Sequence, residues 1–213
     1  NDHVNCGQST NDVIPTAGKM TALRLLKNLK TELLRLHKAL CEKAEEFDGI
    51  LKMGRTQMQD AVPIRLGQEF KAYSVAVMRD IHRMDKAMDE MRCLNMGGTA
   101  IGTGINADET YLRRIVPNLN EVSAMDFVQA FDLIDATQNL DPFVAVSGAV
   151  KACAVTLSKI ANDLRLMSSG PRAGFHEINL PAKQNGSSIM PGKVNPVIPE
   201  VVNQVAFYVI GND

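Results

Sequence analysis

The hydrophobic residues of the chain form long stripes with helical spacing. After a polar segment at residues 1–12, apolar residues recur in steps of three and four, a heptad seam. Ser9–Asp12 are good N-cap residues and Pro15 suits a first turn, so we expect a helix that ends near residues 47–49. Such a helix is about 50 Å long, which is typical of a bundle or a coiled coil. The seam residues are Ala22, Leu26, Leu29, Leu33, Leu36 and Leu40.

The same spacing predicts two more long helices and a shorter last one. One begins after residue 63 and should end at Gly97-Gly98, and the next has Asp141 as its cap and Pro142 at its first position. The last covers residues 196–210, with Asn195 as N-cap and Pro196 in the first turn. We find no alternating strand pattern, so the predicted fold class is all-α, a bundle of long helices. The stripe residues of the two long helices are Phe70, Tyr73, Val77, Ile81, Met84, Met88 and Met91, then Phe143, Val146, Val150, Cys153, Leu157, Ile160, Leu164 and Met167.

Long polar loops rich in Gly, Ser, Thr and Asn separate these helices, and long loops in compact proteins are usually functional. In the glycine-rich run 97–107, Gly102-x-Gly104 follows no predicted strand, so it does not predict a dinucleotide site. We expect its backbone to approach a ligand or another subunit instead. Segment 108–140 should carry shorter helices interrupted by Pro117.

The loop from Gly186 to Pro196 carries the strongest chemical signal. Ser187 and Ser188 follow a glycine, a Pro-Gly turn comes next, and Lys193 and Asn195 stand just before a predicted helix start. Hydroxyl, ammonium, amide and backbone N–H groups would meet there, and a helix N-terminus favours anions. From spacing alone, a surface loop before a capped helix is an equal alternative.

Composition narrows the class of partner. The 213 residues are 45% hydrophobic and 22% charged with a net charge of −1, so the chain lacks the basic excess of a nucleic-acid-binding protein. We find no apolar run near the ~20 residues that span a bilayer, and we expect no membrane partner. Four scattered cysteines without a Cys-x-x-Cys pair predict reduced thiols in a cytoplasmic protein. Because the chain starts at Asn1 without Met, we expect an internal piece of a longer protein.

Three loops taken together resemble the signature regions of the aspartase/fumarase superfamily, and the likeness extends over essentially the whole chain. The run Gly-Ser-Ser-Ile-Met-Pro-Gly-Lys-Val-Asn-Pro is highly specific to that superfamily. Within it, the chain most resembles the members that release ammonia from L-aspartate, on Glu177–Pro181, Pro199–Val205 and Val209–Asp213. The three signature regions are Asn1–Asp12, Gly54–Gln57 and Gly186–Pro196.

The resemblance implies an anti elimination that gives fumarate, with no cofactor and no metal. It implies that Ser187 is the base, acting as an alkoxide, and that Lys193 and Asn195 hold a substrate carboxylate. Fumarase-like members usually carry His where this chain has Gln57, which favours ammonia over water as the leaving group. The other carboxylate and the amino group would be bound by Ser9, Thr10, Asn11, Thr56 and Gln57.

The resemblance also implies an assembly. Residues 1–213 correspond to the central helical domain, without the smaller N-terminal and C-terminal domains. The family forms homotetramers around a core of long helices, and each active site for the dicarboxylate draws its three loops from three subunits. Two alternatives remain open, a fumarate hydratase and a non-catalytic helical oligomerisation fragment. Ser9–Asp12 could also be only a helix cap, and Thr56 and Gln57 only loop hydrogen-bonding residues.

Overall fold

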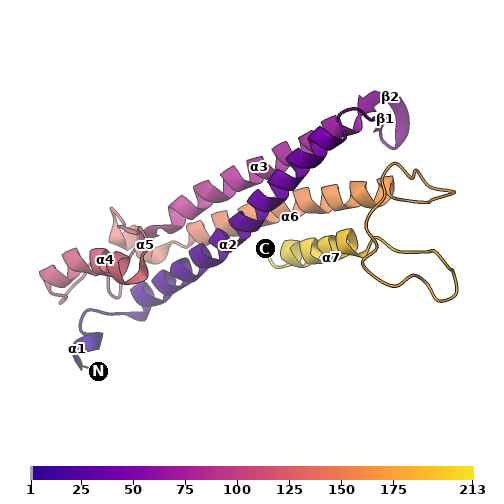
Figure 1. Cartoon of the computed structure of the whole chain (residues 1–213). Helices are drawn as coiled ribbons and strands as arrows, with labels where there is room; N and C mark the ends of the chain where they lie inside the picture. Colours follow the sequence, from indigo (N-terminus) through magenta and orange to yellow (C-terminus); the bar gives the residue numbers. More distant parts are fainter. Residues whose placement is uncertain (1) are drawn as a thin grey trace. The chain divides into compact units, whose positions relative to one another are not determined.

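The computed structural model describes residues 2–213, and these residues are mainly helical, as predicted (Figure 1). Asn1, from the first signature region, lies outside the described residues. The elements in chain order are α1 (Asp2–Asn5), α2 (Thr10–Glu46), β1 (Leu51–Thr56), β2 (Gln59–Arg65), α3 (Leu66–Met91), β3 (Cys93–Leu94), α4 (Glu109–Ser123), β4 (Val128–Gln129), α5 (Leu133–Gln138), α6 (Asp141–Met167) and α7 (Val197–Gly211).

The chain forms two compact units. Unit 1 contains the residues up to Thr31 together with His82–Ser147, and unit 2 contains Glu32–Ile81 and Gly148–Asp213. The long helices α2, α3 and α6 therefore each contribute a part to both units. The site residues predicted from the sequence are divided too, because 9–11 belong to unit 1 and the rest belong to unit 2.

The predicted seams form the core of each unit. Every predicted stripe residue of α3 is buried, from Phe70 to Met91. On α2, every second seam residue is buried, namely Leu26, Leu33 and Leu40, and those between are half-buried. The heptad spacing therefore identified the inward face of both helices. Cys153 is buried in α6 as predicted, and none of the four cysteines within residues 2–213 forms a disulfide.

In unit 1, the first turn of α2 is held by reciprocal hydrogen bonds. The Ser9 N–H donates to Asp12 Oδ1 at 3.0 Å, and the Asn11 N–H donates to Ser9 Oγ at 3.2 Å, an arrangement related to the capping box. Asp12 is fully buried, and its Oδ2 accepts the N–H groups of Gly97 at 3.3 Å and Thr99 at 3.1 Å. The start of α2 is thereby joined to the glycine-rich segment.

Replacing Asp12 with alanine should lower the free energy of unfolding by about 3 kcal/mol, because three N–H groups lose a charged acceptor and two of them are buried. Urea denaturation of the full-length protein measures the change. Asp89→Ala is the matched control, since the Asp89 side chain is 77% exposed and pairs with Arg92 at 3.4 Å. Equal unfolding midpoints for the two variants would contradict this role of Asp12.

The glycine-rich run packs against its own chain. A Cβ on Gly102 would overlap the backbone of Ile134 in α5, and Gly102 has a φ of +92°. The expected close approach of backbone is thus made to α5 within the same unit. α3 ends at Met91, before the predicted stop at Gly97, because the next residues leave the helix to form β3, which pairs in parallel with β4.

Pro117 lies inside α4 and does not interrupt it, contrary to the prediction. α4 is secured by its N-cap, because the Asp108 carboxylate accepts the N–H groups of Thr110 and Tyr111. These two bonds lower the pKa of Asp108. Burial of Val116 adds tertiary packing, which can override the helix-breaking tendency of a proline.

In unit 2, an antiparallel hairpin of β1 and β2 lies between α2 and α3, where the sequence predicted only a loop. Most residues of β2 are exposed on both faces, so the apolar alternation that marks a half-buried strand is missing. The strand register shifts between Gly54 and Arg55. A Cβ on Gly54 would lie 2.7 Å from the Val62 carbonyl oxygen, which explains a glycine at this close approach.

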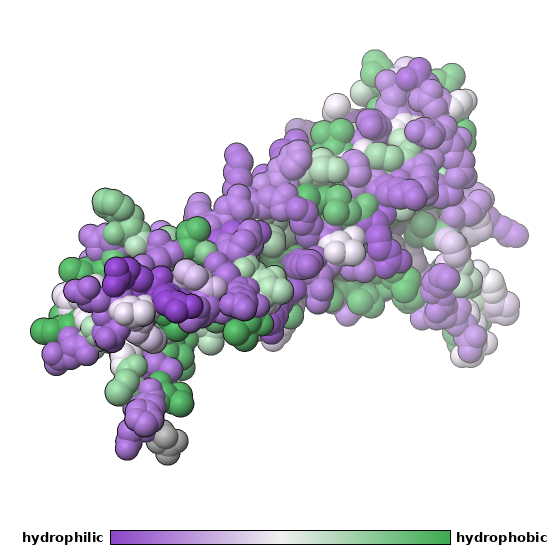
Figure 2. Space-filling view, turned by 60° about the vertical axis from the view of Figure 1, so that its left-hand side comes forward, coloured by the Kyte–Doolittle hydropathy of each residue, from purple (hydrophilic) through white to green (hydrophobic). Residues whose placement is uncertain are grey.

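α7 begins at Val197, and Pro196 occupies the cap position without a side-chain cap bond. The predicted cap by Asn195 is therefore wrong, because the Asn195 carbonyl oxygen accepts the Val197 N–H at 2.9 Å instead. Several large apolar residues of α7 are exposed, among them Val201, Val205 and Tyr208. Figure 2 likewise shows hydrophobic patches on the molecular surface.

The sequence led us to expect no apolar run long enough to span a bilayer, but α6 is a long apolar helix. Its 27 residues include an 18-residue window with a mean hydropathy of 1.5, long and apolar enough by length and composition to cross a membrane. The core helix of a soluble protein meets the same criterion. Asn203 of α7, itself buried, makes hydrogen bonds with Ser158 and Asn162 of α6, so this helix carries a polar contact within unit 2.

Candidate active site

The loop from Gly186 to Pro196 closes on itself at a narrow neck. The Ser187 N–H donates to the Lys193 carbonyl oxygen at 3.0 Å, and the Lys193 N–H donates to the Met190 carbonyl oxygen at 3.1 Å. Gly192, with a φ of +81°, lies in the turn between Met190 and Lys193. Ser187 and Lys193 are six positions apart in sequence, and this neck brings their backbones together.

Ser187 and Pro196 are the half-buried residues of this loop, whereas Ser188 and Lys193 are exposed. Ser187 Oγ accepts the Met190 N–H at 3.2 Å. A donor aimed at an oxygen favours the negatively charged form of that oxygen. The local geometry therefore supplies one of the stabilising contacts that a serine alkoxide needs. Lys193, with its exposed ammonium, belongs to the opposite side of the neck.

The turn that carries Thr56 and Gln57 is tight and strained. Gln57 and Met58 have φ values of 49° and 62°, and both lie in the left-handed region. Two such residues in succession make the type I′ turn of a two-residue hairpin, which normally prefers Asn and Gly. Each non-glycine residue in this region costs about 1–2 kcal/mol, and strain of this kind gathers at functional sites.

A partly buried set of charges surrounds Tyr73 of α3. The Tyr73 hydroxyl is shared between Glu69 Oε1 at 3.0 Å and Asp163 Oδ2 at 2.9 Å. Burial raises the pKa of this phenol, and the two carboxylates raise it further. Tyr73 therefore remains a neutral hydrogen-bond donor throughout the physiological range of pH.

In unit 1, the residues of the first predicted loop are engaged in local structure. Ser9 caps α2, and Asn11 Nδ2 donates to the Ala100 carbonyl oxygen at 2.6 Å. Asn95 Nδ2 donates to the Asn11 carbonyl oxygen at 2.9 Å. Thr10 is the first residue of α2, and its side chain is exposed. The cap contact is therefore present for Ser9, and the Thr10 side chain is exposed at the helix start.

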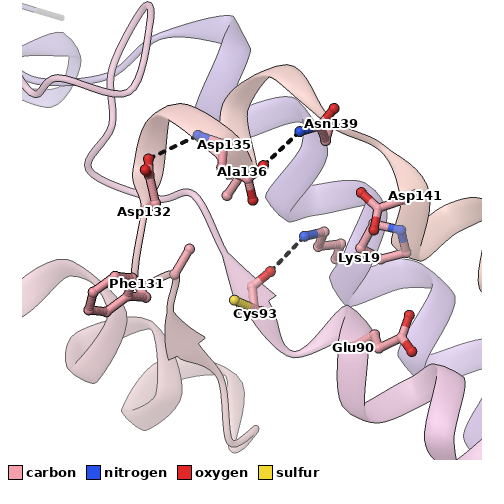
Figure 3. A pocket seen from close by; sticks show the side chains of 11 residues that line it. Lys19, Glu90, Cys93, Phe131, Asp132, Asp135, Ala136, Asn139 and Asp141 are labelled. Carbon is pink, nitrogen blue, oxygen red and sulfur yellow. Dashed lines mark hydrogen bonds between the residues drawn. The ribbon is translucent and has the colours of Figure 1, made fainter.

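A separate cavity of about 410 Å³ lies in unit 1 (Figure 3). The described residues that line it include none of the predicted site residues. Lys19 of α2 points into it and donates to the Cys93 carbonyl oxygen at 2.6 Å. Burial lowers the pKa of Lys19, opposed by the neighbouring charges of Cys93 and Asp141. Among residues 2–213, no group of three His, Cys, Asp or Glu side chains is arranged to hold a metal ion.

The lowered pKa of Lys19 predicts a pH dependence of stability. Between the folded pKa and the ordinary value of 10.5, the unfolded chain binds more protons, so the free energy of unfolding rises with pH. Lys19→Met should remove this rise, as urea denaturation at several pH values would reveal. Lys27→Met, at an exposed position of the same helix, should keep it. A parallel dependence in wild type and Lys19→Met would disprove the assignment.

The structure thus places the predicted site residues in two groups. In unit 2, Ser187, Lys193 and Asn195 share one loop, and Thr56 and Gln57 share the hairpin turn. In unit 1, residues 9–11 share the start of α2. Lys52, Arg55 and Glu177 were not predicted as site residues, and their charged side chains form an ion cluster at β1. Their signal in the sequence was only a lysine and an arginine three positions apart.

The chain is similar to known proteins over its whole length. A family model described as "Lyase" matches residues 1–211. Aspartate ammonia-lyase of Bacillus subtilis is 56% identical over all of this chain and 45% of its own length. A fumarate lyase:delta crystallin structure from Brucella melitensis superposes with a TM-score of 0.96 at 51% identity, over 100% of this chain and 46% of that one. A class II fumarase from Schistosoma mansoni gives 0.88 at 35% identity, over 100% and 48%. The chain spans about half the length of each of these proteins.

Proposed function

We propose that the full-length protein eliminates ammonia from L-aspartate to give fumarate, because this chain belongs to the lyase family. The observation that carries the proposal is the Ser187 loop. The Ser187 hydroxyl oxygen accepts the Met190 N–H at 3.2 Å, and the Ser187 N–H closes the neck of the loop by donating to the Lys193 carbonyl oxygen. An oxygen in this setting is suited to removing a proton beside a carboxylate.

The reaction follows from the charges that it must manage. Ser187, as the alkoxide, takes a proton from C3 of aspartate, and the electron pair spreads into the adjacent carboxylate. The pair then forms the C2–C3 double bond as the C2–N bond breaks, and ammonia leaves with the bonding electrons. Lys193 and Asn195 stabilise the carboxylate while it carries the extra charge. Proton, electrons and leaving group balance without a cofactor or a metal.

The second carboxylate and the amino group need donors that Ser187 and Lys193 do not supply. The short neutral side chains of Ser9, Thr10, Asn11, Thr56 and Gln57 suit this task, because they bind a dianion without neutralising it before reaction. Thr10 and Thr56 are exposed, as a donor to a ligand must be before binding. The strain at Gln57 supports a functional role for the turn.

A homotetramer would complete each active site with loops from three subunits around a core of long helices. Exposed apolar side chains on α6 and α7 support association, since large apolar patches usually mark interfaces. Those on α7 include Val201, Val205 and Phe207, and those on α6 include Val144 and Val155. In this interpretation α6 is an interface helix of a cytoplasmic enzyme, and residues 1–213 are its central domain.

Two comparisons favour ammonia over water as the leaving group. The Bacillus aspartate ammonia-lyase is 56% identical to this chain, whereas the Schistosoma fumarase is 35% identical. Gln57 stands where fumarase-like members usually have histidine, and an amide cannot carry a proton to or from water. Fumarate hydration remains the second candidate, because that fumarase shares the fold over the whole of this chain.

Fumarate absorbance tests the proposal. Full-length protein given L-aspartate should produce fumarate and equimolar ammonia, and L-malate should give little. A reaction with malate alone would establish the hydratase instead. If neither substrate reacts while light scattering shows an oligomer, the helical-module alternative stands.

A further inference from the structure

We propose that Glu177 is a positioning residue that holds the Thr56–Gln57 turn at the root of the Ser187 loop. This inference rests on the proposed function, in which both segments belong to active sites. Glu177 is ten positions before Ser187 and lies on the segment that follows α6 (Figure 1). It contacts β1, whose last residue is Thr56, and therefore links the two signature segments of unit 2.

The backbone around Glu177 is fixed to the end of α6. The Glu177 N–H donates to the Met167 carbonyl oxygen at 2.8 Å, and the His176 N–H donates to that of Ser169 at 2.8 Å. The Phe175 N–H donates to Ser169 Oγ at 3.1 Å. The root of the catalytic loop is thus attached to a long helix, and the Glu177 carboxylate is presented from a defined backbone.

This carboxylate binds two cations of β1. Glu177 Oε1 accepts from Arg55 Nη1 at 2.9 Å, and Glu177 Oε2 lies 3.0 Å from Lys52 Nζ. Lys52 also donates to Glu69 Oε2 at 2.6 Å. The Phe175 ring covers the Arg55 guanidinium at 4.0 Å from ring centroid to Cζ. Apart from the exposed carboxylate of Asp60, the cluster therefore contains two cations and two carboxylates, and an aromatic ring covers it.

A bulge in β2 lies opposite this double contact. Residues three apart on a regular strand point to opposite faces, so an untwisted β1 would not aim both Lys52 and Arg55 at Glu177. Ala61 of β2 is the extra residue at the register shift between Gly54 and Arg55, and such a bulge increases the local twist of both strands. Arg55 directly precedes Thr56, and fixing its guanidinium therefore fixes the start of the strained turn.

The burial of these charged side chains indicates that the cluster orients the joined segments more than it stabilises the fold. The side chains of Lys52, Arg55 and Glu177 are 9%, 19% and 14% exposed. Apolar side chains of similar volume often stabilise such positions as well as a buried ion pair does. A directional charge cluster, in contrast, fixes where the joined segments lie. Placement matters here, because a shift of about 1 Å in a reacting group can lower a rate about 100-fold.

The test compares Glu177→Gln with Asp60→Asn in the full-length protein. Asp60 is the other carboxylate partner of Arg55, at 3.4 Å, but its side chain is 74% exposed and belongs to the same hairpin. Glu177→Gln should lower kcat about 10- to 100-fold with a smaller change in KM, and Asp60→Asn should leave kcat within about twofold. Glu177→Asp, which keeps the charge, should recover part of the loss.

Limited trypsin digestion gives a readout that is independent of turnover. Glu177→Gln should speed cleavage after Lys183 and Lys193, because the root of the loop is released, and Asp60→Asn should not. Unchanged kcat together with unchanged cleavage would overturn the proposal, as would loss of activity that only matches loss of folded protein. If the wild type makes no fumarate from aspartate, the proposed function fails, and the cleavage rates alone then decide the role of Glu177.

Discussion

Ser187→Ala should lower kcat for fumarate formation from L-aspartate by about 10⁴-fold, at the upper end of what a positioned general base contributes. The alanine variant keeps the backbone of the neck, because the bond to the Lys193 carbonyl oxygen comes from the Ser187 N–H. It loses only the oxygen that accepts the Met190 N–H. The substrate should therefore still bind, with KM changed far less than kcat.

Ser188→Ala is the matched control, since it removes an exposed hydroxyl from the adjacent position. Its kcat should stay within about threefold of wild type, a change that corresponds to well under 1.4 kcal/mol. Steady-state rates at saturating aspartate measure both variants. Full activity in Ser187→Ala, or equal losses in the two variants, would remove Ser187 from the role of base.

Lys193→Met should lower kcat/KM by about 10³-fold. Methionine nearly matches the length of the side chain, while the cation that we propose to face the developing carboxylate charge is lost. Removing one donor from a preorganised anion site costs about 10²- to 10³-fold, and a charged donor contributes at the upper end. Because the charge grows during the reaction, kcat should fall as well as affinity.

Lys183→Met controls for the loss of a positive charge in the same segment, as Lys183 is also exposed. Rates measured over a range of salt concentrations separate long-range attraction of the substrate from direct contact with it. Lys183 should contribute only a screened, long-range attraction that fades with salt. A loss at Lys193 that vanished in high salt, as for Lys183, would mean that Lys193 attracts the substrate without contacting it.

The helical part of the fold could be predicted because burial repeats with the period of the helix. The α3 stripe from Phe70 to Met91 was correct at every position, since each of those side chains faces the interior. Helix ends were less predictable. Asn195 has the right side chain for a cap, yet the cap position of α7 is Pro196, because local backbone geometry decides the cap and residue type only favours it.

The hairpin could not be predicted, because its strands are held by backbone pairing and by charges. Lys52 and Arg55 are ordinary surface residues in a sequence, and only the folded, twisted hairpin brings both to Glu177. The Ser187 loop was recognisable from its residues. Its closure by the Ser187–Lys193 backbone bond was not, since any residue could make that bond.

Activity of mixed oligomers tests the central claim, that Ser187 acts in a site assembled from several subunits. Full-length Ser187→Ala subunits would be reassembled with Thr10→Val/Thr56→Val subunits, each inactive or nearly so alone. If the three loops come from three subunits, a random equal mixture should recover about one eighth of wild-type activity. Activity is measured as fumarate formation from L-aspartate. It should not recover when the two proteins are mixed without subunit exchange. A mixture that exchanges subunits and stays inactive would contradict the shared site.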